Sequence, residues 1–489
     1  MAKEDGLIIE APRTGIAQSP HVGFGDVRNL DIVSNPGVAI LNNILAKKSA
    51  STVDALVNWI VQDSVATGSF VALDANGSVY NSNDSGVTWA ELSDRDGAGQ
   101  GAVIWKDYLF IAEVTTIDVF GPLSGGAAGW TNNWQTITTD SLWHPMIVSK
   151  NDGNIYGGAG RYIFSIAENS GQTFAPGTAG TYTFTAQALD LPANYRVKCL
   201  AELGNNLMIG TWMGTNVYDI RLADIFPWDR SSASFGQPVE IAEHGVHAML
   251  NDGNSLVVLA GIGGTIYRSD GVNAYVIGQI PNSVANILGG KYIEFYPGSL
   301  CKFKNRIFFG VSNGGSTAVG GMGVYSLLQT GRGNILNLEH TISTTSDGSS
   351  NPLKVSALIP TSRDELLAAW RDNATYGIDK TTNTSYTTSY GAYFETPLYR
   401  VGTNLNLATF TELEFQLSKD LAANEGIRVA YRENLTDSFT TIGTYDFSVL
   451  GAVISHNVVA SIPATELLQL RVSLTGTTST PQLRNIKLK

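Results

Sequence analysis

The stretch Ser82-Asn83-Asp84-Ser85-Gly86-Val87-Thr88-Trp89 decides the fold. A carboxylate at its third position accepts hydrogen bonds from the backbone N–H groups that follow, which closes a turn. Gly86 supplies a left-handed backbone conformation at no steric cost. The stretch therefore predicts a tight turn between two strands of a sheet, with Trp89 packed between strands as its apolar anchor.

Outward from this turn, the same order of apolar strands and short turns returns along the chain. Asn76-Gly77, between two apolar strands, is the strongest short-range signal of a hairpin. Seven copies of the pattern begin near Val57, Ala102, Pro145, Cys199, His247, Leu300 and Val355. Their spacing of roughly 45–50 residues is typical of propeller blades. We therefore expect a single closed, roughly seven-bladed β-propeller over residues 51–390.

The second strand of each copy often ends in small residues, as in Gly157-Gly158, Gly210-Thr211 and Ala260-Gly261. Inner strands of a propeller crowd around a central axis, so small side chains are expected there. The third strand often holds an aromatic residue, which we expect to pack between blades.

The two ends of the chain do not follow this pattern. From about Tyr393 the strands are longer and alternate more evenly, which predicts a C-terminal β-sandwich over residues 391–489. Residues 1–50 are interpreted as an N-terminal arm that either helps to close the ring or reaches a neighbouring chain. Within the arm, residues 39–48 follow Pro36 and predict either a short helix or a strand leading into the first blade.

Composition agrees with an all-β fold class. The chain has 489 residues, of which 43% are hydrophobic and only 15% charged, and it contains 52 glycines; such a composition favours many short strands. The net charge of -12 argues against a surface that grips phosphates. It is compatible with a channel through which DNA passes without adhering, because like charges repel.

Few residues suggest chemistry. Cys199 and Cys301 lie among apolar residues and are expected to be buried reduced thiols. His244 and His247 could share a metal only across a turn, since residues three apart in a strand face opposite sides. No phosphate-binding glycine motif occurs, so no cofactor is expected. An apolar signal region and an 18-residue apolar run are both lacking, so we expect no secretory signal and no membrane span.

The Ser82–Trp89 stretch matches the Asp-box, S-x-D-x-G-x-T-W, at Ser82, Asp84, Gly86, Thr88 and Trp89. In the families that carry it, this motif is a structural turn between the third and fourth strands of a blade. Glu168-Asn169-Ser170-Gly171-Gln172-Thr173-Phe174 looks like a decayed second copy. Sialidases carry Asp-boxes, but their R-I-P motif is missing here and no carboxylate pair suited to glycoside hydrolysis can be identified. We therefore predict no enzymatic activity and no catalytic, cofactor-binding or metal-binding residues.

Several stretches carry a further resemblance. They are Val22-Gly23-Phe24-Gly25-Asp26-Val27-Arg28-Asn29-Leu30-Asp31-Ile32 with Pro36-Gly37, Gly426–Arg432, and Leu468–Gly476 with the closing Leu483–Leu488. Together with the propeller, they resemble structural proteins of tailed bacteriophages, whose last sandwich domain ends in similar strands. Propellers also occur in the tail hub or nozzle of short-tailed phages, where a ring of copies surrounds the DNA exit channel.

This resemblance implies a virion protein of the tail, synthesised in the host cytoplasm. Its expected partners are copies of itself in a ring and other tail proteins, with passing contact to viral DNA but no tight binding. One alternative is a glycan- or receptor-binding tail module, in which Trp130, Trp134 and Trp143 serve as platforms for a host surface glycan. A second alternative is an Asp-box glycoside hydrolase of the sialidase type.

Overall fold

The computed structural model describes residues 7–10, 26–35, 37–49, 53–63, 68–93, 95, 97–124, 128–137, 143–212, 222–281, 290–330, 333–344, 346–382, 385–388, 391–403, 406–450 and 455–489. The chain packs into two compact units. The ring unit comprises residues 47–323 and 344–380, and the sandwich unit comprises residues 1–46, 324–343 and 381–489. The domain boundaries drawn from the sequence at residues 50 and 390 stay predictions.

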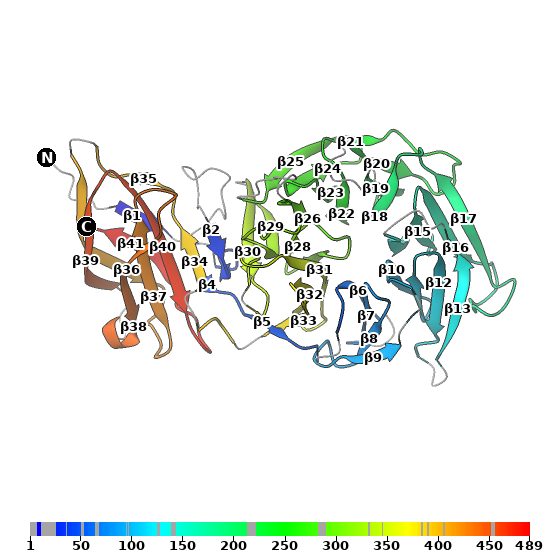
Figure 1. Ribbon diagram of the computed structural model, residues 1–489, viewed down its shortest axis with the longest axis horizontal. Helices are drawn as coiled ribbons and strands as arrows, with labels where there is room; N and C mark the ends of the chain where they lie inside the picture. Colours follow the sequence, from blue (N-terminus) through cyan, green and yellow to red (C-terminus); the bar gives the residue numbers. More distant parts are fainter. Residues whose placement is uncertain are drawn as a thin grey trace. The chain divides into compact units, whose positions relative to one another are not determined.

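Seven blades, numbered 1 to 7 in chain order, build the ring unit; six are separate four-stranded antiparallel sheets, and the strands of blade 6 belong to a larger sheet (Figure 1). Blade 1 has β6 (Val57–Gln62), β7 (Phe70–Asp74), β8 (Val79–Ser82) and β9 (Ala90–Ser93); blade 2 has β10 (Gly101–Trp105), β11 (Tyr108–Ala112), β12 (Thr116–Gly121) and β13 (Gly129–Thr136). Blade 3 has β14 (Met146–Val148), β15 (Ile155–Ala159), β16 (Tyr162–Glu168) and β17 (Tyr182–Asp190). Blade 4 has β18 (Arg196–Leu203), β19 (Asn206–Trp212), β20 (Ala223–Trp228) and β21 (Val239–Ile241).

Blade 5 has β22 (Val246–Asn251), β23 (Leu256–Ala260), β24 (Thr265–Ser269) and β25 (Ala274–Gln279). After the short strand β26 (Ile293–Glu294), blade 6 contributes its inner strands β27 (Leu300–Phe303) and β28 (Arg306–Asn313) to this unit. Blade 7 has β31 (Leu353–Pro360), β32 (Leu366–Asp372) and β33 (Thr375–Thr381). The first strand of each blade contacts the first strand of the next, and β31 contacts β6, so the ring is closed.

Blade 7 is completed from upstream in the chain. Its fourth strand is β5 (Leu45–Lys47), which precedes blade 1 in the sequence. Just beyond β5, the backbone N–H groups of Lys48 and Ser49 both donate to the carbonyl of Ile378, at 2.8 and 3.2 Å. The segment predicted to be either a helix or a leading strand is therefore a strand, and it ties the first blade to the last.

Neighbouring blades approach so closely that the second strand has no room for a side chain. A Cβ atom at Gly158, Gly210 or Gly310 would lie 2.5, 2.7 or 2.6 Å from a methyl group of a valine. The valines are Val197, Val246 and Val355, each near the start of the first strand of the following blade. The small residues noted in the sequence thus mark where one blade packs on the next.

Polar residues on the first strands of several blades form hydrogen bonds to the neighbouring blade. The first strands of blades 1, 4, 5 and 7 each contain a β-bulge, and the extra residues are Asn58, Lys198, His247 and Ser356. A bulge changes the direction of a side chain, so that it no longer follows the regular alternation between the two faces of the sheet. Asn58 Nδ2 donates to the carbonyl of Gly99 at 3.2 Å, and Ser356 Oγ donates to the carbonyl of Val57. Each of these two bonds reaches from one blade to the chain of the next.

Two large sheets form the sandwich unit. One has the order β1 (Leu7–Glu10), β41 (Leu483–Leu488), β36 (Ala408–Leu417) and β39 (Ser455–Thr465). The other runs β29 (Gly323–Thr330), β30 (Gly333–His340), β2 (Asp26–Arg28), β34 (Ala392–Glu395), β40 (Leu467–Thr475), β37 (Gly426–Arg432) and β38 (Thr440–Asp446). Shorter elements are β3 (Leu30–Asp31) with β4 (Ile40–Leu41), β35 (Tyr399–Arg400) on β40, and α1 (Phe447–Leu450).

The core of the sandwich lies between these sheets. Phe415 and Ile486 of the first sheet and Val429 and Val472 of the second are fully buried, and the rings of Phe415 and Tyr445 lie 5.0 Å apart. Strands of the predicted N-terminal arm belong to this unit, because β1 pairs with β41 and β2 pairs with β34. Residues 22–25 of the stretch that resembles phage proteins lie outside the described residues.

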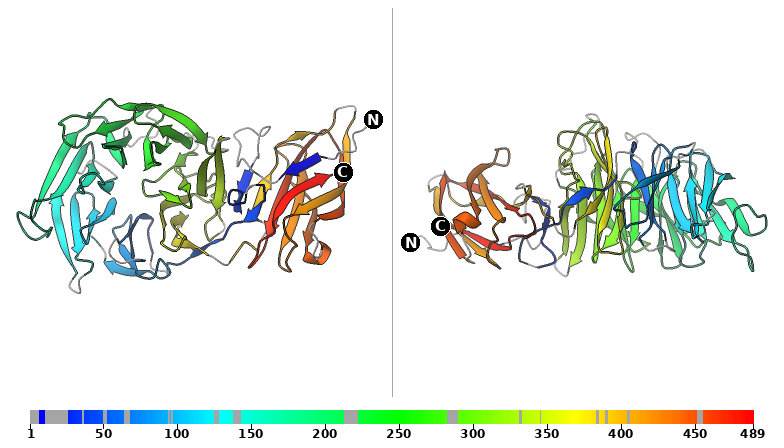
Figure 2. Two further views of the ribbon diagram at one scale, coloured as in Figure 1. Left: turned by 180° about the vertical axis from the view of Figure 1, so that it is seen from behind. Right: turned by 90° about the horizontal axis from the view of Figure 1, so that it is seen from below.

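The predicted fold class is confirmed: the chain is all-β, with a seven-bladed propeller and a β-sandwich. Figure 2 shows the same strands from behind and from below. Across the described residues, no helix is both long and apolar enough to cross a membrane.

We predict that Gly310→Ala destabilises the propeller by about 1–3 kcal/mol, the usual cost of overpacking a core. The new methyl group would lie 2.6 Å from the backbone carbonyl oxygen of Val355, which cannot rotate away as a side chain can. Gly129→Ala in β13 is the matched control, because its Cβ would meet nothing within 4 Å. Urea unfolding of the three proteins measures the difference; equal stability of both variants would contradict the packing argument.

Candidate functional site

The Ser82–Trp89 turn is closed by one carboxylate. Asp84 Oδ1 accepts hydrogen bonds from the backbone N–H groups of Val87 and Thr88 at 2.9 and 2.8 Å, and Oδ2 accepts from the Thr88 hydroxyl at 2.7 Å. Ser82 Oγ donates to Asp84 and accepts from the N–H of Gly86, both at 2.9 Å. Partial burial raises the pKa of Asp84, but these hydrogen bonds outweigh burial and hold it at about 2. The carboxylate is therefore fully committed to the turn.

The same turn lies where the ring closes. Trp89 is 5% exposed and belongs to a core that combines blade 1 with Leu367, Ala369 and Ile378 of blade 7. Gly86 has a φ of 77°, and a Cβ there would lie 2.5 Å from Leu367. The turn therefore holds the first blade against the last.

Equivalent turns in other blades have the same construction. The Glu168–Phe174 turn joins the third and fourth strands of blade 3, and Glu168 Oε1 accepts from the N–H of Phe174 at 2.8 Å. Phe174 is 2% exposed and packs edge-on against Trp105 of blade 2, with ring centroids 5.0 Å apart. As in blade 1, the aromatic residue after the turn packs on the preceding blade.

Two further acid-capped turns were not singled out from the sequence. Asp229 in blade 4 accepts from the N–H groups of Ser231 and Ser232 at 2.9 and 2.7 Å, and Asp270 in blade 5 accepts from those of Val272 and Asn273 at 2.9 and 2.7 Å. The available signal was an Asp followed by small or turn-forming residues between two apolar strands. The complete motif was too strict a pattern to find them.

Aromatic side chains fill the propeller axis at one face. Leu56, Trp143, Trp212 and Tyr296 form one buried cluster, and the rings of Trp143 and Tyr296 lie 5.6 Å apart, edge to face. Trp143 precedes blade 3 and Tyr296 precedes blade 6, so these blades, three apart in a ring of seven, meet at the axis. The axis of a single propeller is therefore packed with side chains at this face.

A buried lysine and histidine lie beside this cluster. Lys198 Nζ is 2.6 Å from His247 Nδ1, and lies 5.5 and 5.8 Å from the ring centroids of Trp143 and Trp212. Burial lowers the pKa of Lys198, and the charge of Glu294 opposes that effect. Burial, together with the charges of Lys198 and His244, lowers the pKa of His247 well below its usual value. Neutral His247 accepts a hydrogen bond from Lys198, so both side chains are engaged in packing blade 4 on blade 5.

The other residues weighed in the sequence are also engaged in packing. Trp134 Nε1 donates to the carbonyl of Pro176 at 2.9 Å, and Trp130 packs on Phe120 with ring centroids 4.8 Å apart and lies under the Arg95 guanidinium at 4.2 Å. Cys199 and Cys301 are buried and free, and burial raises the pKa of both thiols. In the described part of the chain, no three His, Cys, Asp or Glu side chains are grouped as a metal site.

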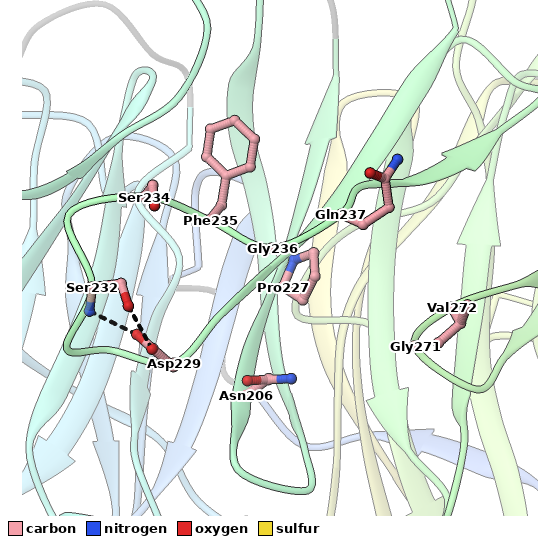
Figure 3. A pocket seen from close by; sticks show the side chains of 10 residues that line it. All are labelled: Asn206, Pro227, Asp229, Ser232, Ser234, Phe235, Gly236, Gln237, Gly271 and Val272. Atoms are coloured by element: carbon pink, nitrogen blue, oxygen red, sulfur yellow. Dashed lines mark hydrogen bonds between the residues drawn. The ribbon is translucent and has the colours of Figure 1, made fainter.

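An open pocket of about 450 Å³ lies between blades 4 and 5. It is lined by Asn206, Pro227, Asp229, Ser232, Ser234, Phe235, Gly236, Gln237, Gly271 and Val272. In Figure 3 the acid-capped Asp229 turn lies on one side and the Gly271–Val272 turn on the other, with Pro227 and Gly236 between them. This pocket combines apolar side chains with uncharged polar groups and a single carboxylate.

No family model matches the chain, and no curated protein matches it. Among solved structures, it is similar to the extracellular domain of a hybrid two-component system from B. thetaiotaomicron, with 13% identity and a TM-score of 0.47 over 77% of this chain but only 43% of that one. It is similar to YCF48 bound to D1 peptide, with 12% identity and a TM-score of 0.43 over 73% and 97% of the two chains. It is also similar to the computationally designed Ika8 protein, with 14% identity and a TM-score of 0.39 over 68% and 98%. These likenesses concern the fold alone.

We predict that Trp89→Ala destabilises the protein by about 3–5 kcal/mol, as for other large-to-small changes in a core. The substitution would leave a cavity where blade 7 meets blade 1. Val87→Ala in the same turn is the control, because Val87 is 38% exposed and should cost little. Thermal unfolding compares the two, and an unchanged midpoint for Trp89→Ala would contradict the role assigned to this turn.

We predict that acidification from pH 8 to 5.5 lowers the stability of the native protein more than that of His247→Gln. In the folded state the pKa of His247 is depressed and the ring stays neutral. The unfolded chain binds a proton below about pH 6.5, so acid favours unfolding. Glutamine accepts from Lys198 but does not titrate. Calorimetric midpoints at both pH values test this; the buried His144 contributes equally to both proteins, so parallel shifts would contradict the role of His247.

Proposed function

We propose that this chain is a non-enzymatic structural protein of a virion, a hub, nozzle or ring component of a phage tail. In this proposal it assembles with copies of itself and with other tail proteins around the DNA exit path. The proposal rests on the resemblance of residues 22–32, 426–432, 468–476 and 483–488, together with the propeller, to phage tail proteins. The Ser82–Trp89 turn enters it as a structural Asp-box.

The observation that carries an assembly role is apolar side chains left in solvent. Val272 and Val276 in the ring unit are 74% and 55% exposed, and Val459 in the sandwich unit is 89% exposed. Val272 and Val276 lie only four residues apart, and neighbouring exposed apolar side chains can form a contact with another protein. Near the propeller axis, in contrast, Lys198 and His247 are hydrogen-bonded to each other.

In this proposal, the packed propeller axis and the net negative charge of the chain determine where DNA would pass. Trp143 and Tyr296 meet across the propeller axis, so a DNA path would have to lie between copies of the chain. Such a conduit should repel DNA phosphates weakly. It should also hold no cluster of basic residues, because a basic cluster binds DNA by releasing its counterions. The net charge of -12 supports that property.

We predict that antibodies against the purified chain decorate the tails of intact particles, and that native mass measurement of the protein gives a multimer. Retention on duplex DNA should be absent at moderate salt. A strictly monomeric protein that is missing from purified particles would contradict the virion proposal. Hydrolysis of a sialoside or polysaccharide, lost on substitution of one carboxylate, would establish the hydrolase alternative instead.

A further inference from the structure

The last strand of blade 5 begins close to the pocket between blades 4 and 5. Val272 lines the pocket, and β25 begins two residues later. Val276 on β25 pairs with Tyr267, which packs into the core shared by blades 4 and 5. Residues paired across two strands lie on the same face of the sheet, so Val276 lies on the face of β25 directed toward blade 4. We call the pocket together with Val276 the seam groove.

Tyr275 lies on the opposite face of the same strand. It pairs with Arg268, one residue from Tyr267, and it is 54% exposed, against 55% for Val276. Side chains of consecutive strand residues point to opposite faces. The chain therefore offers two side chains of equal exposure, one at the seam groove and one away from it.

The only charged side chain that lines the described pocket is a carboxylate, and the neighbouring Arg230 is paired with Glu202. Asp229 lines the pocket, and Asp270 borders Val272 in the opposite turn. Hydrogen bonds from Ser232 and Ser231 lower the pKa of Asp229, and those from Asn273 and Val272 lower the pKa of Asp270, so both stay ionised. Lysine and arginine are missing among the residues that line the pocket. A partner with positive charges would therefore be attracted to the carboxylates of the groove, and its apolar side chains could contact the exposed valines.

We propose that the seam groove binds an extended, basic and apolar segment of another protein. Apolar side chains of that segment would cover Val272 and Val276, and its lysines or arginines would face Asp229 and Asp270. A second copy of this chain fits less well, because a chain of net charge -12 brings acids to acids. Nucleic acid is disfavoured because its phosphates would meet the same carboxylates. A pocket of about 450 Å³ is within the usual size of binding sites.

This inference rests on the proposed assembly role, but it can fail independently of it. The test uses the full chain and a fluorescein-labelled synthetic peptide that alternates lysine and valine, read by fluorescence anisotropy. A peptide with glutamate in place of lysine is the charge control. We expect saturable binding of the lysine peptide only.

Substitution of the groove separates this site from general attraction to an acidic protein. Val276→Lys and Val272→Lys should each weaken binding by about tenfold, because each removes an apolar contact and adds a like charge. Tyr275→Lys adds the same charge on the other face of β25 and should leave binding unchanged. All three positions are exposed, so the fold should tolerate them.

The opposite results overturn the inference. They are no saturable binding, equal binding of the glutamate peptide, equal loss in all three variants, or competition for the groove by a neutral oligosaccharide. A chain that fails these tests and still decorates phage tails would leave the proposed function standing without this groove.

Discussion

The close approach of neighbouring blades is the constraint on which the rest of the ring depends. At Gly158, Gly210 and Gly310 the second strand carries no side chain, and a valine of the next blade occupies that space. A larger side chain at any of these positions would push two blades apart. Because the ring is closed, the other blades would have to move as well to accommodate the shift. The polar residues on the bulged first strands, such as Asn58 and Ser356, lie in the same crowded zone and satisfy backbone carbonyls of the next blade.

The outer part of the ring solves the same packing problem with turns. The third and fourth strands of blades 1, 3, 4 and 5 are joined by turns in which an acid accepts backbone N–H groups. Because the acid supplies these hydrogen bonds locally, the residues around it are free to reach the preceding blade, as Trp89 and Phe174 do. The full motif stands in blade 1, where the turn packs against the last blade.

Local periodicity was enough to predict the blades, because each blade is built from strands adjacent in sequence. Contacts between distant residues were not predictable in this way. β1 pairs with β41 from the other end of the chain, and nothing in Leu7-Ile8-Ile9-Glu10 specifies that partner. The axial contact of Trp143 with Tyr296, and of Lys198 with His247, depends on ring geometry that a linear pattern does not encode. The same limit explains why the sequence leaves open whether Trp143 packs between blades or serves as a sugar platform, whereas the structure places it in a buried cluster.

The distribution of charge between the axis and the rim bears on how such a chain can act. At the axis, burial depresses the pKa of Lys198 and His247, and each has the other as partner; a ligand entering there would first have to separate them. The seam between blades 4 and 5 differs, because Asp229 and Asp270 cap turns at the surface, are exposed to solvent and lie near the exposed Val272. Recognition at the rim therefore requires no rearrangement of the core, so a propeller of this construction can bind a partner while its ring stays closed.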